Sequence, residues 1–153
     1  MYNTIVVGTD GSETAGTALA HAVALAKSFD GMLHIVHAYR TVSASDVVSA
    51  ATAGTAMPDF ASVNEGIKAT SEHVLEHGVA AADREGVKAQ GHAVPGDAAD
   101  ALINVAEQVH ADVIVVGNRG MAGLRRFLLG SVPNKVAHQC PCSILIVNTA
   151  ADA

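Results

Sequence analysis

The chain has 153 residues, half of them hydrophobic and 3% aromatic, and its formal net charge at pH 7 is −6. This length suits one domain with a full core and leaves no room for a second domain. The acidic balance argues against broad nucleic-acid binding, which needs many Lys and Arg side chains to neutralise phosphates. No basic targeting segment opens the chain and no apolar run approaches the roughly 18 residues of a membrane helix, so we expect a soluble, cytoplasmic protein.

The first forty residues predict a strand, a helix and a second strand. Residues 3–8 are a short β-branched apolar run, and Thr9 to Ser12 suit a tight turn and a helix cap. Apolar residues then recur at three- and four-residue steps from Thr14 to Phe29, which indicates an amphipathic helix. Met32 to Tyr39 follows as the second strand. The first strand therefore ends in a polar corner.

The middle of the chain contains an aperiodic segment, followed by further helices and strands. The segment at about residues 40–60 is rich in Ala, Ser, Thr and Gly and is long for a connection, so we expect a mobile loop with a role as a lid. Helical periodicity then runs from about residue 59 to Arg84, and Val87 to Val94 predicts a third strand. Asp97 can cap the next helix, and Asp112 to Gly117 is the fourth strand.

A glycine-rich stretch from Gly117 to Ser131 follows the fourth strand directly. Glycine lets a ligand approach main-chain N–H groups, and a helix N-terminus offers unpaired donors and a partial positive charge. Ser131 can cap the helix that runs to about Gln139, and Cys142 to Val147 is the fifth strand. The stretch therefore suits an anion, although a surface loop that uses glycine for turns would look similar.

Basic side chains gather around this stretch. No Asp or Glu occurs between Asp112 and Asp152, so we expect a local positive field inside an acidic protein. Four of the nine Lys and Arg residues lie there, namely Arg119, Arg125, Arg126 and Lys135.

Alternating strands and helices predict an α/β fold: a single doubly wound domain with a parallel sheet and helices on both faces. Ligands of such sheets lie outside the carboxyl ends of the strands, where the strand order reverses. Asp10 and Gly117, at the ends of the first and fourth strands, are then expected to form the floor of one crevice. We expect the domain to span residues 1–149 and residues 150–153 to form a frayed tail.

The histidines and cysteines show no metal-binding pattern. His34 and His37 are three apart in one strand, so alternation places them on opposite faces. Cys140 and Cys142 flank Pro141, too close for an easy disulfide and too few for a secreted scaffold. We interpret both as reduced thiols that pack near the start of the last strand, because a metal site would need further ligands.

Two common phosphate-binding motifs do not fit the glycine-rich stretch. A Walker A loop has Lys and then Ser or Thr after its last glycine, whereas Gly130 is followed by Ser131 and Val132. The dinucleotide fingerprint follows an early strand and is followed about 20 residues later by an acid. Here the glycines come late, and the next acid is Asp152. Both motifs are therefore excluded.

A third pattern fits over nearly the whole chain. Gly117-x-x-Gly120, nine residues and then Gly130-Ser131 match the pattern G-x-x-G, nine residues, G-[ST]. This is the motif of the nucleotide-binding members of the universal stress protein family. Val6 to Ser12 resembles the first strand and acid of that family, and Gly130 to Val147 resembles its C-terminal helix and strand. The chain thus resembles an ATP-binding universal stress protein.

The resemblance implies a five-stranded sheet in the order 3-2-1-4-5, with an adenine nucleotide at its carboxyl edge. The adenine and ribose would lie near Gly8, Thr9, Asp10, Ala38 and Val116. The phosphates would lie over Gly117, Arg119, Gly120, Gly130, Ser131 and Val132. Glycine amides and a serine hydroxyl suit phosphate oxygens, and Asp10 can accept from sugar hydroxyls or hold a nucleotide-bound Mg²⁺.

Several alternatives stay open at these positions. Asp10 also fits the role of N-cap of the first helix, and Arg125 and Arg126 fit a solvated face better than a phosphate site. The pair Asp97-Ala98 departs from the family, whose members often have proline after this polar residue.

The ligand we expect is ATP, with cyclic AMP as the alternative, in a protein of stress response or signalling. Hydrolysis needs a residue that orients water, and the late loop offers no acid and no His before His138. Asp10 is the nearest carboxylate candidate. We therefore expect no catalytic residue and at most a weak ATPase.

The last strand predicts a partner. Residues 142–147 form an apolar strand near the C-terminus, and in family members the last strand pairs across a two-fold axis. An exposed apolar edge strand would otherwise be an aggregation hazard. The resemblance therefore implies a homodimer through this strand.

Overall fold

The computed structural model describes residues 1–55, 59–118 and 128–149. The strands are β1 (Thr4–Gly8), β2 (Met32–Tyr39), β3 (Ala89–Pro95), β4 (Val113–Gly117) and β5 (Ser143–Val147). The helices are α1 (Glu13–Phe29), α2 (Ala44–Thr52), α3 (Phe60–Arg84), α4 (Ala98–Gln108) and α5 (Ser131–Gln139). None of the helices within the described ranges is long and apolar enough to cross a membrane.

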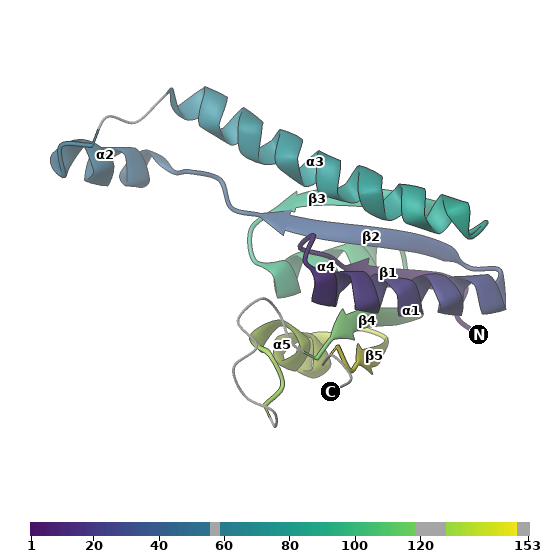
Figure 1. Cartoon of the computed structure of the whole chain (residues 1–153). Coiled ribbons are helices and arrows are strands. Elements are labelled where there is room, and N and C mark those ends of the chain that lie inside the picture. Colours follow the sequence, from purple (N-terminus) through teal and green to yellow (C-terminus); the bar gives the residue numbers. More distant parts are fainter. Residues whose placement is uncertain (56–58, 119–127, 150–153) are drawn as a thin grey trace.

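The five strands form one parallel sheet in the order β3-β2-β1-β4-β5 (Figure 1). β1 is central, and Val6 lies in register between His34 of β2 and Ile114 of β4. The chain builds outward from β1 to β3 on one side and then returns to add β4 and β5 on the other. The predicted α/β fold and strand order are confirmed. The order reverses between β1 and β4, which makes their carboxyl ends the expected site of a ligand crevice.

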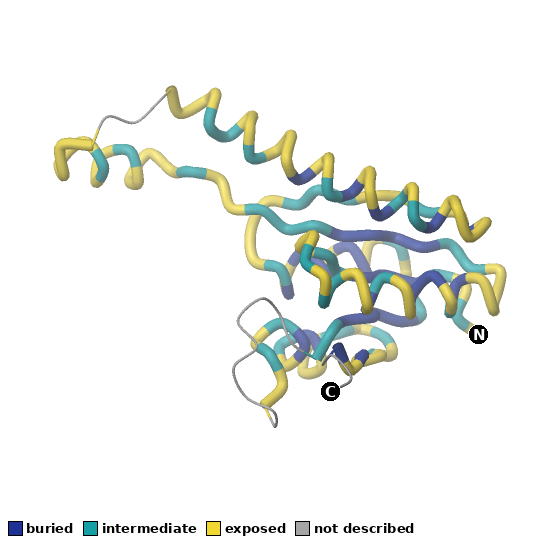
Figure 2. Tube along the Cα trace, in the orientation of Figure 1, coloured by how far each residue is buried: buried dark blue, intermediate teal, exposed yellow. Residues whose placement is uncertain are grey.

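Each central strand is buried on both faces, because helices cover the sheet on both sides (Figure 2). Ile5 and Val7 of β1 point into a cluster with α1 and α3, whereas Val6 points into a second cluster with α4 and α5. β4 repeats this alternation with Val115 and Ile114. Runs of β-branched residues without polar alternation are typical of such doubly covered parallel strands.

The segment predicted as a loop at about residues 40–60 contains the helix α2, so the expectation of an irregular loop was wrong in part. Ser43 and Asp46 form a capping box, in which the Ser43 backbone N–H donates to Asp46 Oδ2 at 2.7 Å. Such a box satisfies helix-end donors locally and stabilises a short helix without a buried face. No residue of α2 is buried, and Figure 1 shows it projecting away from the sheet. The mobility of this segment and its role as a lid stay predictions.

The third strand begins two residues later than predicted, at Ala89. Val87 is buried, but its N–H donates to Ala82 O and closes the end of α3. Gly86 supplies the positive φ of 75° that this helix ending needs. The apolar character of Val87 therefore reflects core packing after a helix and not membership of the strand.

Candidate functional site

A pocket of about 150 Å³ lies at the carboxyl ends of β1 and β4, the place where the strand order reverses. The strand ends and the starts of three helices, α1, α4 and α5, form its wall. Its lining residues are Gly8, Thr9, Asp10, Ser12, Thr14, Ala15, Ala18, Val36, Ala38, Ala98, Leu102, Val116, Gly117, Gly130, Ser131, Val132 and Pro133.

Nine of the eleven residues predicted to bind a nucleotide line this one pocket. They are Gly8, Thr9, Asp10, Ala38, Val116, Gly117, Gly130, Ser131 and Val132. The other two, Arg119 and Gly120, lie outside the described residues, as do Arg125 and Arg126. The sequence thus grouped positions up to 124 residues apart, while their role in binding stays a prediction.

The contribution of α1 and α4 to the pocket wall was not predicted from the sequence. Ser12, Thr14 and Ala15 begin α1, and Leu102 belongs to the apolar stripe of α4. Apolar periodicity assigned Leu102 to the core, and nothing in its spacing distinguishes a residue that packs from one that also borders a cavity. The helix starts could have been inferred, since every helix after a parallel strand begins at the carboxyl edge.

Small residues keep the floor of the pocket open. A Cβ atom at Gly8 would lie 3.1 Å from Leu102 Cδ1, so a larger residue there would press on α4. Ala38 and Ala98 line the same space with single methyl groups. The Thr9 backbone N–H donates to Val36 O at 2.9 Å, which fixes the chain as it leaves β1. This part of the pocket can therefore admit a flat group between apolar walls.

The polar corner after β1 is held by its own hydrogen bonds. Asp10 Oδ1 accepts from the Ser12 backbone N–H at 2.9 Å, and Gly11 turns with φ 78°. Ser12 is the N-cap of α1, and its Oγ accepts from the Ala15 N–H at 3.2 Å. The alternative that Asp10 caps α1 is therefore wrong, because Ser12 has that role. Asp10 holds the turn and lines the pocket.

The start of α5 differs from the prediction that Ser131 is its N-cap. Gly130 occupies the cap, with φ −60° and ψ 162°, and its carbonyl accepts from the Asn134 N–H at 3.0 Å. Ser131 is one residue inside the helix, because the turn into α5 begins at Gly130. Within the described residues, no side chain makes a cap bond at this helix start. First-turn N–H groups lack helix partners, so those of Ser131 and Val132, which bond to no other described residue, are available at the pocket wall.

Asn118 joins the two glycine positions of the pocket. Its backbone carbonyl accepts from the Gly130 N–H at 3.0 Å, and its own N–H donates to Val147 O at 2.8 Å. Its side chain Oδ1 accepts from both the backbone N–H and the hydroxyl of Thr149, at 2.9 and 3.0 Å. The end of β4, the start of α5 and the end of β5 are thereby held together. No sequence motif predicted a role for Asn118.

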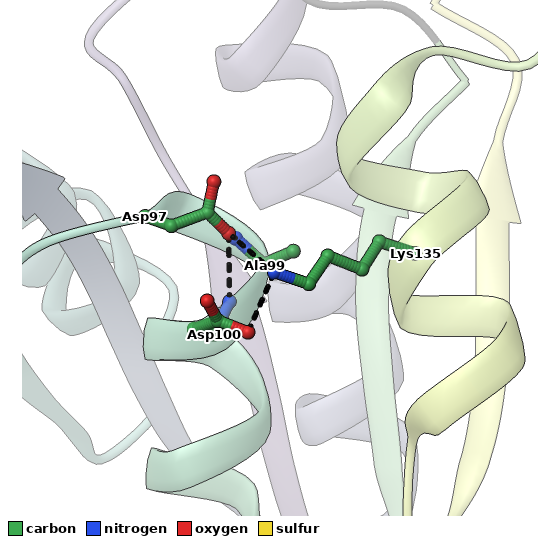
Figure 3. Close-up of polar contacts among 4 residues, drawn as sticks. All are labelled: Asp97, Ala99, Asp100 and Lys135. Atoms are coloured by element: carbon green, nitrogen blue, oxygen red, sulfur yellow. Dashed lines mark hydrogen bonds and ion pairs between the residues drawn. The ribbon is translucent and has the colours of Figure 1, made fainter.

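Lys135 connects α5 to α4 beside the pocket (Figure 3). Its Nζ lies 2.7 Å from Asp100 Oδ1 and 3.2 Å from Asp97 Oδ1. Hydrogen bonding to Asp100, reinforced by Asp97, raises the pKa of Lys135 above its ordinary value. The expected positive field is therefore smaller at this position than the sequence indicated, because two carboxylates from α4 balance Lys135.

Asp97 is the N-cap of α4, as predicted. Its Oδ1 accepts from the Ala99 and Asp100 N–H groups, both at 3.1 Å. The bond from the Asp100 N–H is the main cause of a lowered Asp97 pKa, and Lys135 adds to it. The start of α4 is thus closed by its own side chain, whereas that of α5 is open to the pocket.

The histidines of the neighbouring strands have partners on opposite faces, as alternation predicted. His34 Nδ1 lies 2.9 Å from His92 Nε2, and His37 Nδ1 lies 2.6 Å from Ser71 Oγ. Burial lowers the pKa of His37, while the nearby charge of Asp10 opposes this shift. No three His, Cys, Asp or Glu side chains gather into a metal site within the described part of the chain.

The two cysteines are free and half-buried at the start of β5. Cys140 Sγ donates to Cys142 O at 3.1 Å, and both residues pack against the cluster beneath α4 and α5. Burial raises the pKa of the Cys142 thiol. These observations agree with the interpretation that both are reduced thiols in a packing role.

A doubly wound sheet with a crevice at its switch point defines a class of small α/β domains built around that crevice. The model of the universal stress protein family matches residues 1–148, and the chain belongs to this family.

Relatives and a solved structure resemble the chain over almost its whole length. Universal stress protein YxiE of Bacillus subtilis is 34% identical over 149 residues, which cover 96% of this chain and 99% of YxiE. Universal stress protein MJ0531 of Methanocaldococcus jannaschii is 32% identical over 147 residues, covering 96% and 82% of the two chains. A crystal structure of a universal stress protein in complex with cAMP superposes with a TM-score of 0.74 at 31% identity, covering 97% and 99%.

Proposed function

We propose that this universal stress protein binds an adenine nucleotide, with ATP preferred, and acts in stress response or signalling with little or no hydrolysis. The observation that carries the proposal is the open start of α5, which lies in one pocket with the strand ends Gly8 to Asp10 and Gly117. An open helix start, glycines and small apolar walls together suit a ligand that has both an anion and a flat ring.

The two ends of the ligand would contact different parts of the pocket. The adenine lies between Ala38 and Val116 above Gly8, where side chains are small or apolar. The ribose hydroxyls donate to Asp10, whose carboxylate also suits a nucleotide-bound Mg²⁺. The phosphates lie over Gly117 and Gly130 and accept hydrogen bonds from the main-chain N–H groups of Ser131 and Val132 and from the Ser131 hydroxyl, and Arg119 and Gly120 complete this set.

Cyclic AMP is the second candidate ligand. It is supported by the 31% identical universal stress protein whose crystal structure is a complex with cAMP. A cyclic phosphate offers one charge, whereas the G-x-x-G and G-S positions and an uncapped helix offer donors for several phosphate oxygens. We therefore rank ATP first. Competition between the two nucleotides for one protein sample decides the order.

Slow hydrolysis follows from the carboxylate and imidazole groups around the pocket. Asp10 is the carboxylate in the described lining, and it already accepts from the Ser12 N–H. His37 lies near Asp10, but its Nδ1 is engaged by the buried hydroxyl of Ser71. Neither arrangement places a base ready to orient an attacking water. Turnover of labelled ATP well above about one per minute would contradict this part of the proposal.

Ligand identification is the direct test of nucleotide binding. Protein purified without added nucleotide is denatured, and the released small molecules are identified by mass spectrometry. Titrated ATP should also raise the melting temperature. Gly117→Val should lose both signals while keeping the far-ultraviolet spectrum, because a branched side chain crowds the phosphate side. Gly66→Val is the matched control, since a Cβ at Gly66 meets no atom within 4 Å. Absence of nucleotide and an unchanged melting temperature in the unaltered protein would remove the proposal.

We also propose a homodimer through β5. This strand lies at one edge of the sheet, and Leu145 and Ile146 are each 38% exposed there. Pairing with a second copy would cover these side chains and provide hydrogen-bond partners for the backbone N–H and C=O groups of the edge strand. Sedimentation at micromolar concentration should give a dimer, and Ile146→Lys should shift it to a monomer. A monomeric unaltered protein would contradict this assembly.

A further inference from the structure

Two helix starts lie in the pocket wall, and one group of charges links them. α4 contributes Ala98 and Leu102 to the wall, and α5 contributes Ser131 to Pro133. The two helices pack against each other on the same face of the sheet. Lys135 is four residues after Ser131, hence on the same side of α5. Its side chain reaches from α5 to the first turn of α4 (Figure 3).

The contacts of Lys135 reach the first turn of α4. Its Nζ is 2.7 Å from Asp100 Oδ1 and 3.2 Å from Asp97 Oδ1. The same Asp97 oxygen accepts from the Ala99 and Asp100 N–H groups. One ammonium thus holds the cap and the first turn of α4 against α5, next to Ala98 in the pocket wall.

The three side chains also set the charge beside the pocket. One ammonium and two carboxylates give a net charge of −1. Loss of Lys135 would make this −2 near the start of α5, where the proposed phosphates bind, and loss of Asp100 would make it zero. The side chains are 36% to 52% exposed, so solvent and salt reduce the effect to a moderate one.

We propose that the Lys135, Asp97 and Asp100 triad sets the preference of the pocket for nucleotides with more phosphate groups. Lys135 neutralises carboxylates of α4 that would repel a polyphosphate, and it fixes the spacing of α4 and α5. The triad residues are positioning residues, because they act through the two helices and through their charge. The inference rests on the proposed nucleotide binding and adds the residues that tune it.

The test measures binding of adenosine, AMP, ADP and ATP by calorimetry. Lys135→Met should weaken ATP binding about threefold to tenfold and AMP binding less, and it should leave adenosine within about twofold. Asp100→Asn should change ATP affinity in the opposite direction. The double variant restores the net charge of −1, so its ATP affinity should return to within about twofold of the unaltered protein. The difference between the unaltered protein and Lys135→Met should shrink at high salt.

Lys135→Arg is the conservative control, since it keeps the charge and should bind ATP as the unaltered protein does. Equal weakening of adenosine and ATP in Lys135→Met would indicate lost packing and would overturn the inference. A double variant that binds ATP no better than Lys135→Met would also overturn it. If the unaltered protein binds ATP but Lys135→Met binds it equally well, the inference alone fails. If the unaltered protein binds none of the four, the proposed function fails and the inference with it.

Discussion

The two halves of the sheet differ in how their polar groups are partnered. In the outer half, formed by β2 and β3, His34 pairs with His92 and His37 pairs with the buried Ser71. In the half formed by β1, β4 and β5, the ends of β1 and β4 open into a pocket that Val36 and Ala38 of β2 also line, and α5 begins there without a side-chain cap among the described residues. Polar side chains in the half formed by β2 and β3 are thus hydrogen-bonded to each other or to a buried hydroxyl. In the other half, polar groups face a cavity.

Residue type alone is therefore a weak guide to function in this protein. Histidine is the first candidate for acid–base chemistry near neutral pH, yet His34, His37 and His92 of the outer half have partners inside the protein. The groups proposed to bind the ligand are main-chain N–H groups at the start of α5, beside Gly117 and Gly130. A polar group already bonded inside the protein gains little from a ligand, whereas an open helix start gains a strong partner.

The largest predicted effect comes from closing the open helix start with Gly130→Asp. The backbone of Gly130 has an ordinary extended conformation, and a Cβ there would lie 3.4 Å from Asn118 O. An Asp cap would accept from the Val132 N–H and place a negative charge at the proposed phosphate site. ATP affinity should fall about 100-fold or more, by calorimetry, while the melting temperature stays equal or rises by about 1–3 °C.

Gly130→Asn separates the two causes of that loss. It offers the same cap without the charge, so ATP affinity should fall by less than in Gly130→Asp. Undiminished ATP binding in Gly130→Asp would show that α5 does not receive the phosphates, and the contrast between the two halves of the sheet would then lose its functional meaning.

The sequence predicted the parts of the site that depend on local pattern. Gly117 and the turn around Asp10 come at the ends of strands with strong β-branched runs, and Gly130 directly precedes the next helix, so their position at the carboxyl edge followed from topology. The pairing of Lys135 with Asp97 could not be read in this way, because it joins side chains 38 residues apart whose distance depends on helix packing. Lys135 consequently looked like part of a positive field when it is balanced by α4.

Two other predictions, the N-cap of α5 and the irregular loop before α3, were wrong for local reasons. Ser131 fitted an N-cap by residue type, but the chain enters α5 one residue earlier, because Gly130 is already tied to Asn118. The helix α2 has no buried face, so hydrophobic periodicity could not reveal it. Its capping box from Ser43 to Asp46 was present in the sequence, and an S-x-x-D pattern was the signal that would have found it.

The next largest effect is expected from Asp97→Ala, which removes the side-chain cap of α4. Loss of the cap leaves the Ala99 and Asp100 N–H groups without their acceptor and should cost about 1 kcal/mol of unfolding free energy, or about 2–4 °C in melting temperature. The folded-state pKa of Asp97 is lowered, so its stabilisation is present above the unfolded pKa of about 4 and is lost as the pH falls through the folded value. The difference between variant and unaltered protein should therefore vanish in strong acid.

Asp97→Asn is the control for this variant, because asparagine caps nearly as well as aspartate. It should retain most of the stability at pH 7 and lose the acid dependence. If Asp97→Ala melts at the same temperature as the unaltered protein at pH 7, the start of α4 is not held by this carboxylate.

The smallest effect concerns the closed half of the sheet. Burial lowers the pKa of both His34 and His92, and the charge of His92 lowers that of His34 further. The folded protein therefore binds fewer protons than the unfolded chain below about pH 6.5, so stability is complete above that pH and falls as the solution becomes more acidic. His92→Gln keeps a hydrogen-bonding side chain but removes one titrating group. The drop in melting temperature between pH 7.5 and pH 5.5 should then be smaller by about 1–3 °C than in the unaltered protein. ATP affinity at pH 7.5 should stay the same, because neither histidine lines the pocket. If His92→Gln instead weakened ATP binding and left the pH response unchanged, this interpretation would be wrong. The histidine pair would then belong to the half of the sheet that opens into the pocket.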